Sequence, residues 1–99
     1  MKLTVEDVIK ILNENNSEIK NFGVKEIYLF GSVARGEATE KSDVDFFIDF
    51  GPEGADFFTL YDLEKFLTSK LKTKVDLGTK NSLHPLLKDK ILKEALRVA

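Results

Sequence analysis

Apolar residues recur at two different spacings along the chain, and the spacings divide it into helices and strands. From Val5 to Leu12 they are three or four positions apart, and Thr4 with Asp7 has the form of a capping pair. This pattern predicts a helix over residues 4–20, although three asparagines weaken its second half.

The strand patterns are of two kinds. Residues 24–30 form a nearly continuous apolar run, which predicts a buried strand. Residues 43–50 alternate, with the aspartates on one face, which predicts a half-buried strand. Leucines at helical spacing predict a helix over residues 56–71, and residues 74–77 predict a third, short strand.

A final helix is predicted near the C-terminus, because Pro85 suits the first turn of a helix. Its apolar stripe comprises Leu87, Ile91, Leu92, Ala95 and Leu96.

Composition narrows the class of protein. Ninety-nine residues suit one domain, so we expect residues 1–99 to fold as a single unit. The net charge of -2 does not favour nucleic acid as a partner, since phosphate binders are usually basic. The longest apolar runs are far shorter than a membrane span of about twenty residues, and no secretory signal stands at the N-terminus. The chain contains no cysteine, and we expect a cytoplasmic protein.

Candidate chemistry lies between the first two predicted strands. Gly31-Ser32 ends one strand, ten residues follow, and Asp43-Val44-Asp45 opens the next. Glycine lets a phosphate approach the backbone, and Ser32 offers an N–H and a hydroxyl as donors. Asp43 and Asp45, two apart on a strand, share a face and can hold one or two hard cations, for which Mg²⁺ fits best.

The paired aspartates have a simpler explanation as the solvent face of an edge strand. Aspartate is depleted in strands, however, and the four fixed positions match by chance in on the order of one in a thousand chains. We therefore favour the functional interpretation. Asp49 lies about 13 Å further along the strand and is left out of the site. His84, before Pro85, is better explained as a helix-entry residue than as a catalyst.

The string GSVARGEATEKSDVDFFIDF, with VDLGTKNSLHPLLKDKILKEAL near the end, resembles the minimal nucleotidyltransferases of the DNA polymerase β-like superfamily. Over essentially the whole chain it is similar to the antitoxin branch encoded beside HEPN-domain toxins. The resemblance implies an α+β fold with a small mixed sheet flanked by helices. It also implies a protein adenylyltransferase that uses ATP and Mg²⁺ and joins a helical HEPN-type toxin in a hetero-oligomer, moving AMP onto a toxin tyrosine.

The resemblance further implies a third catalytic carboxylate on a later strand, and Asp76 is the convincing match. Its alternation with apolar neighbours supports an outward carboxylate, which we expect to act as general base as well as metal ligand. Arg35 could meet the triphosphate or the partner, or could equally pair with Glu37 or Glu40. Ser42, beside the carboxylates, is a further candidate for nucleotide binding.

Two alternative functions remain open. The chain could be a nucleotidyltransferase for a small molecule, although it is short and offers no second domain to enclose a small acceptor. It could also be an antitoxin that binds its partner without catalysis, although a binding module has no need of three carboxylates on one polar face.

Overall fold

The computed structural model describes residues 3–79, 89 and 93–99, and a single sheet organises them. Its strands are β1 (Glu26–Phe30), β2 (Val44–Asp49), β3 (Val75–Thr79) and β4 (Leu96–Arg97). They lie in the order β3-β2-β1-β4. β1 is antiparallel to both β2 and β4, whereas β2 and β3 are parallel. The expected α+β fold with a small mixed sheet is therefore confirmed.

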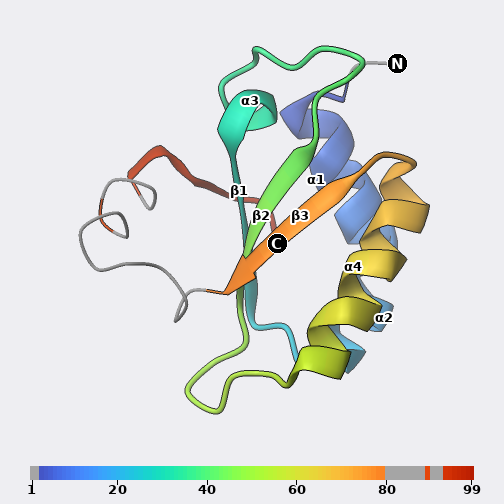
Figure 1. Cartoon of the computed structure of the whole chain (residues 1–99), viewed down its shortest axis with the longest axis vertical. Helices are drawn as coiled ribbons and strands as arrows, with labels where there is room; N and C mark the ends of the chain where they lie inside the picture. The colour runs from blue at the N-terminus through green and yellow to red at the C-terminus, as the bar shows by residue number, and fades with distance from the viewer. Residues whose placement is uncertain (1–2, 80–88, 90–92) are drawn as a thin grey trace.

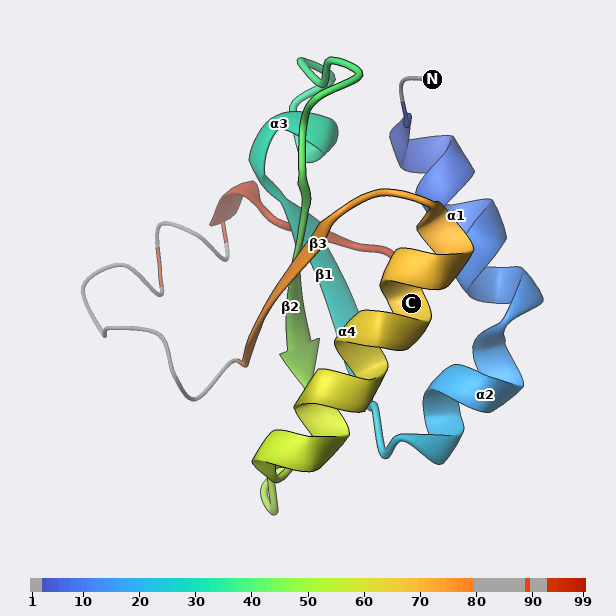
Figure 2. The same cartoon turned by 45° about the vertical axis from the view of Figure 1, so that its right-hand side comes forward.

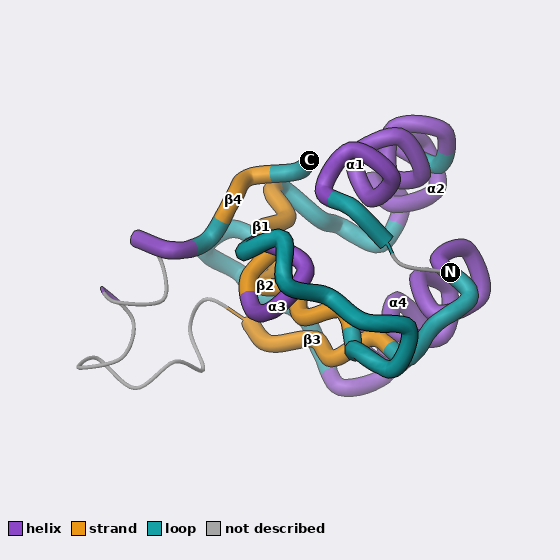
Figure 3. The backbone as a smooth tube through the Cα atoms, turned by 90° about the horizontal axis from the view of Figure 1, so that it is seen from above, coloured by secondary structure: helices purple, strands orange, loops and turns teal. Residues whose placement is uncertain are grey.

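Helices cover one face of this sheet. These are α1 (Val5–Glu14), α2 (Asn16–Asn21) and α4 (Phe57–Leu71), and a short helix, α3 (Gly31–Ala34), comes directly after β1. In Figures 1 and 2, α1, α2 and α4 lie together on one side of the sheet, while α3 follows the end of β1. Figure 3 shows the same layers from above. A parallel β2–β3 pair needs a crossover, which α4 supplies.

The core fills the space between the sheet and these helices. Apolar residues at helical spacing meet the inward positions of the strands there, as the two periodicities require. The buried members from the helices are Val8, Leu12, Ile19, Val33, Leu63, Leu67 and Leu71. The buried members from the first three strands are Ile27, Leu29, Val44, Phe46, Ile48 and Val75. The opposite face of β2 is thus left for the aspartates.

The first predicted helix is two helices. Asn15 separates α1 from α2, and its side-chain amide donates a hydrogen bond of 2.8 Å to the carbonyl of Ile11. An asparagine side chain that binds nearby backbone competes with helix continuation. The prediction of one helix over residues 4–20 was therefore wrong at Asn15.

The strand β2 is buried on both faces at its centre, not half-buried as predicted. Phe47 points to the same face as the aspartates, yet only 3% of its surface is exposed. Its ring stacks on that of Phe30, with centroids 4.2 Å apart and planes 13° apart. The alternation was correctly read, but the cross-strand aromatic contact closes this part of the polar face.

The predicted final helix is wrong at its end. Leu96 lies in β4, where it pairs with Leu29 of β1, and the last two residues continue the backbone bonding with Ile27. Pairing with a sheet edge satisfies backbone groups that a helix end would leave open. Pro85, Leu87, Ile91 and Leu92, as well as His84, lie outside the described residues. Among the described helices, none is long and apolar enough to cross a membrane.

Candidate active site

The turn after β1 brings its backbone against a carboxylate of β2. Gly31 has a φ of +77°, and a Cβ built on it would collide with Oδ2 of Asp45. Glycine is therefore required here twice, for its left-handed backbone and for the close approach. The register explains the contact, because Phe30, the residue before Gly31, is paired with Asp45. The predicted Gly31-Ser32 turn and the Asp43-Val44-Asp45 strand thus lie together.

Asp76 lies directly beside Asp45. The two are partners in the parallel register of β2 and β3, on strands that are about 4.8 Å apart. Partial burial raises the pKa of Asp45 above its ordinary value of 3.8, and the charges of Asp76 and Asp43 raise this pKa further. Arg35 acts in the opposite direction. The structure therefore gathers three carboxylates that repel one another, with Asp45 at the centre.

Asp43 is engaged with a lysine. Nζ of Lys74 lies 3.7 Å from Oδ2 of Asp43, and both side chains are well exposed. The backbone holds them together, because Val44 donates a hydrogen bond of 3.0 Å to the carbonyl of Lys74. In the sequence, the signal for this pair was the place of Lys74, two residues before Asp76.

The three carboxylates have the right chemistry for Mg²⁺ but are not arranged around one position. Carboxylate oxygens are the ligands this ion prefers, and their mutual repulsion is what a cation relieves. Within the part of the chain that the structure describes, however, no three acidic, histidine or cysteine side chains converge closely enough to hold a metal ion. The donor set fits the ion, and Asp43 would have to turn from Lys74 toward Asp45 and Asp76.

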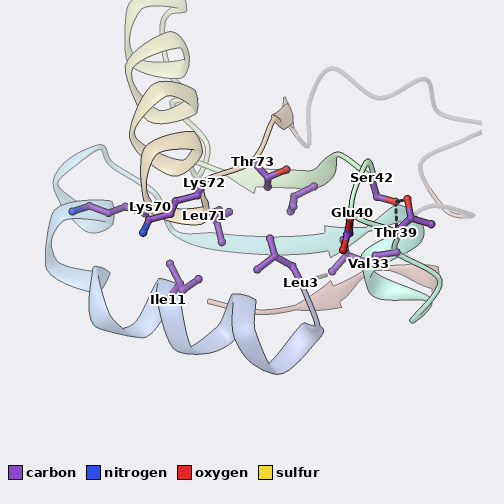
Figure 4. A pocket seen from close by; sticks show the side chains of 12 residues that line it. Leu3, Ile11, Val33, Thr39, Glu40, Ser42, Lys70, Leu71, Lys72 and Thr73 are labelled. Carbon is purple, nitrogen blue, oxygen red and sulfur yellow. Dashed lines mark hydrogen bonds between the residues drawn. The ribbon is translucent and has the colours of Figure 1, made fainter. Parts of the chain in front are cut away.

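Two further predicted residues have local partners. Nε of Arg35 lies 3.0 Å from Oε2 of Glu37, the pairing that the sequence left open as an alternative to phosphate. Oγ of Ser42 accepts a hydrogen bond of 2.8 Å from the N–H of Thr39. Figure 4 shows Ser42 turned toward Thr39 at the rim of a cavity of about 460 Å³. The Ser42 hydroxyl is bonded to Thr39 in this structure, and its role in nucleotide binding stays a prediction.

That cavity lies on the helix side of the sheet. Its lining includes Ile11 of α1, Leu71 of α4 and Val44, the inward neighbour of the aspartates. Asp45 and Asp76 do not line it. The carboxylates belong to the opposite, more open face.

Aromatic side chains adjoin the carboxylates on this face. The stacked pair of Phe30 and Phe47 occupies the positions beside and after Asp45, and Gly78 lies opposite Phe47 in the register. A Cβ on Gly78 would lie 3.3 Å from the Phe47 ring, so the strand leaves the ring just enough room. The alternation of residues 43–50 places Phe47 on the face of the aspartates, but it does not reveal the contact with Phe30.

Comparison with known proteins decides the family. The model of the nucleotidyltransferase domain matches residues 5–98. The chain belongs to the nucleotidyltransferase domain family. The predicted enzyme class, a nucleotidyltransferase, is thereby confirmed.

Relatives of this nucleotidyltransferase sharpen the comparison. It is 40% identical over 97 residues to the protein adenylyltransferase MntA of Thermococcus cleftensis, with 97% of each chain covered. A solved structure classed as a minimal nucleotidyltransferase has a TM-score of 0.81 and 32% identity, covering 95% of both chains. A toxin–antitoxin structure with AMP-PNP has a TM-score of 0.71 and 26% identity, covering 98% of this chain and 73% of that one. The expected resemblance and fold are confirmed.

Proposed function

We propose that this nucleotidyltransferase is a protein adenylyltransferase antitoxin, which moves AMP from ATP onto a tyrosine of a helical HEPN-type toxin. One observation carries the proposal: Asp45 lies between the Gly31 turn and Asp76. A nucleotide held at this turn would have its phosphates beside two carboxylates on adjacent strands. The similarity to MntA and to a toxin–antitoxin pair with AMP-PNP supports the acceptor class and the nucleotide.

The chain's own groups have separable tasks in this proposal. The bare backbone at Gly31 admits a phosphate, and the N–H and hydroxyl of Ser32 donate to it. Asp76, on the exposed edge of the site, accepts the proton of the tyrosine hydroxyl. The tyrosine oxygen then bonds to the α-phosphorus while the bond to the leaving pyrophosphate breaks.

Asp43, Asp45 and Asp76 would hold Mg²⁺ in the working complex. When bound, the ion would neutralise the phosphate charge that three carboxylates otherwise repel. To bind the ion, the Asp43 carboxylate would have to break its ion pair with Lys74. The lysine ammonium group would then be free to face the nucleotide. The cytoplasm is our proposed location, where ATP and the toxin would both be present.

The test is transfer to a defined acceptor. The chain, ATP and Mg²⁺ are incubated with the helical protein encoded by the neighbouring gene, and intact masses are measured. We expect a gain of about 329 Da per AMP on the partner, with peptide analysis assigning it to tyrosine. The Asp43→Asn, Asp45→Asn double variant should give none. The toxicity of the partner is measured as well. If the double variant neutralises the partner as well as wild type does, and no tyrosine is modified, the chain is a non-catalytic binding module instead.

A further inference from the structure

An apolar patch is fixed at the start of α4. It consists of Phe57, Phe58 and Tyr61, whose side chains are 87%, 81% and 53% exposed. With Leu60 they line a shallow apolar hollow. Large exposed aromatic groups in one place are typical of interaction sites, and here they add nothing to the core of the fold.

The patch is held in place by a formed helix end. Oδ1 of Asp56 accepts a hydrogen bond of 2.8 Å from the N–H of Thr59, the N-cap arrangement that anchors a first turn. This bond lowers the pKa of Asp56, so the cap is ionised at neutral pH. On the far side, Nζ of Lys65 lies 4.7 Å from the centroid of the Tyr61 ring. The backbone that carries the aromatic groups is therefore already helical, which reduces the entropy lost on binding.

Charge around the patch indicates its occupant. Glu53, Asp56 and Asp62 are exposed and close to the patch in the chain, and we call them the acidic rim; Lys65, over the Tyr61 ring, adds one positive charge. Two copies joined through this patch would bring like charges together across their interface. A partner with an apolar pocket and a basic rim would instead meet complementary charge. The acidic rim thus favours a different protein over a second copy of this chain.

The patch lies away from the carboxylates. β2 carries the chain from Asp45 to Asp49, about 13 Å by strand rise, and the turn before α4 follows. Figure 1 shows α3 at the top and the start of α4 at the bottom of the molecule. Binding at the patch can therefore change without any change in the groups that hold the nucleotide.

We propose that Phe57, Phe58 and Tyr61 form a docking surface for the protein acceptor, separate from the site of transfer. This inference rests on the proposed function for the identity of the partner, a helical toxin with a basic-rimmed apolar pocket. The surface holds the acceptor by burying the aromatic rings, while the acidic rim orients it.

The experiment separates docking from chemistry. The partner is the helical protein encoded by the neighbouring gene, and the variant is Phe57→Ser with Phe58→Ser. The control is Leu96→Ser, because Leu96 is also an exposed apolar residue, 41% exposed, but lies in the edge strand β4 and not in the patch. Calorimetry measures partner and ATP binding, and intact mass measures transfer. We expect the double variant to bind the partner at least tenfold more weakly and to raise KM for it. Melting temperature, ATP affinity and kcat should stay unchanged, and Leu96→Ser should match wild type.

A second pair tests the charge argument. Glu53→Lys with Asp62→Lys should weaken partner binding more than Glu53→Gln with Asp62→Asn, and salt should reduce the difference.

The outcomes are distinguishable. Equal partner affinity in wild type and the serine variant would overturn the docking surface, whether or not AMP is transferred. If wild type binds the partner, the serine variant binds it more weakly, and the partner gains no AMP, the docking surface is supported and the transfer is refuted. No complex with the partner would overturn both. Sedimentation of the chain alone supplies a final check, since a wild-type dimer lost in the serine variant would make the patch a self-interface.

Discussion

Lys74 and Asp43, the residues immediately before the parallel strands β3 and β2, form an ion pair with 3.7 Å between Nζ and Oδ2. The lysine is 71% exposed and the aspartate 40%, so water screens the pair and its contribution to stability is small. Its importance lies in competition: the ammonium group occupies the carboxylate that the proposed Mg²⁺ site needs.

Lys74→Met should therefore increase metal affinity while leaving the fold intact. We expect binding of Mn²⁺, a paramagnetic substitute, to tighten by up to about fivefold without nucleotide, the range of one exposed ion pair. Electron paramagnetic resonance of free Mn²⁺ measures this directly. Lys74→Arg should keep the wild-type affinity. Weaker metal binding in the methionine variant would show that the lysine does not compete.

Gly31→Ala should cost both stability and transfer. The substitution forces a left-handed backbone on alanine, a strain of about 1 to 3 kcal/mol, and drives the new methyl group into Asp45. Gly36→Ala is a matched control, since Gly36 has a φ of +73° with nothing within 4 Å of a Cβ. Chemical denaturation and AMP transfer should show both variants destabilised and only Gly31→Ala inactive. Equal activity in the two would mean that the close approach is not needed.

Asp45→Asn should stabilise the fold in a pH-dependent way. The pKa of Asp45 is raised in the folded chain, so ionisation above its ordinary value of 3.8 favours unfolding. Asp45 therefore costs the fold no stability below about pH 3.8, where it is protonated in both the folded and the unfolded chain. The free energy of unfolding falls as pH rises through the pKa of Asp45 in the folded chain. Asparagine does not ionise, so the variant should melt higher than wild type at pH 7 and alike at pH 3. A lower melting temperature at pH 7 would assign Asp45 a structural role.

ATP should bind weakly when divalent metal is removed. The triphosphate then meets the uncompensated charges of Asp43, Asp45 and Asp76, which repel it. Calorimetry in Mg²⁺ and in excess chelator makes the comparison, and Asp43→Asn with Asp45→Asn should reduce the difference. The same affinity in both conditions would contradict a bridging metal.

The fold class, and the placing of Asp43 and Asp45 on one face, could be predicted from the sequence because both depend on short-range spacing. A period of two places Asp43 and Asp45 on one face of a strand, and leucines at helical spacing mark α4. The register of Asp45 against Asp76 was not readable, since it depends on how a distant strand docks. Asp76 was predicted from the resemblance to the family, and the structure shows that it lies beside Asp45.

The two wrong helix predictions, over residues 4–20 and at the C-terminus, failed for reasons that the spacing of apolar residues does not show. The break at Asn15 depends on a side-chain amide choosing the Ile11 carbonyl, and β4 depends on the open edge of β1. Each of these is a choice between partners of similar energy, which tertiary context decides.

The parallel pairing of β2 with β3 also has a kinetic consequence. Asp45 and Asp76 meet only after the chain has passed through the whole of α4, a contact of high sequence separation that forms slowly compared with a hairpin. The hairpin of β1 and β2 can assemble first and bring Gly31 to Asp45 while the third carboxylate is still absent. A newly made or partly unfolded chain would then have half of its site and no general base. The site would therefore be complete only once β3 has paired with β2, whatever the state of the β1–β2 contact.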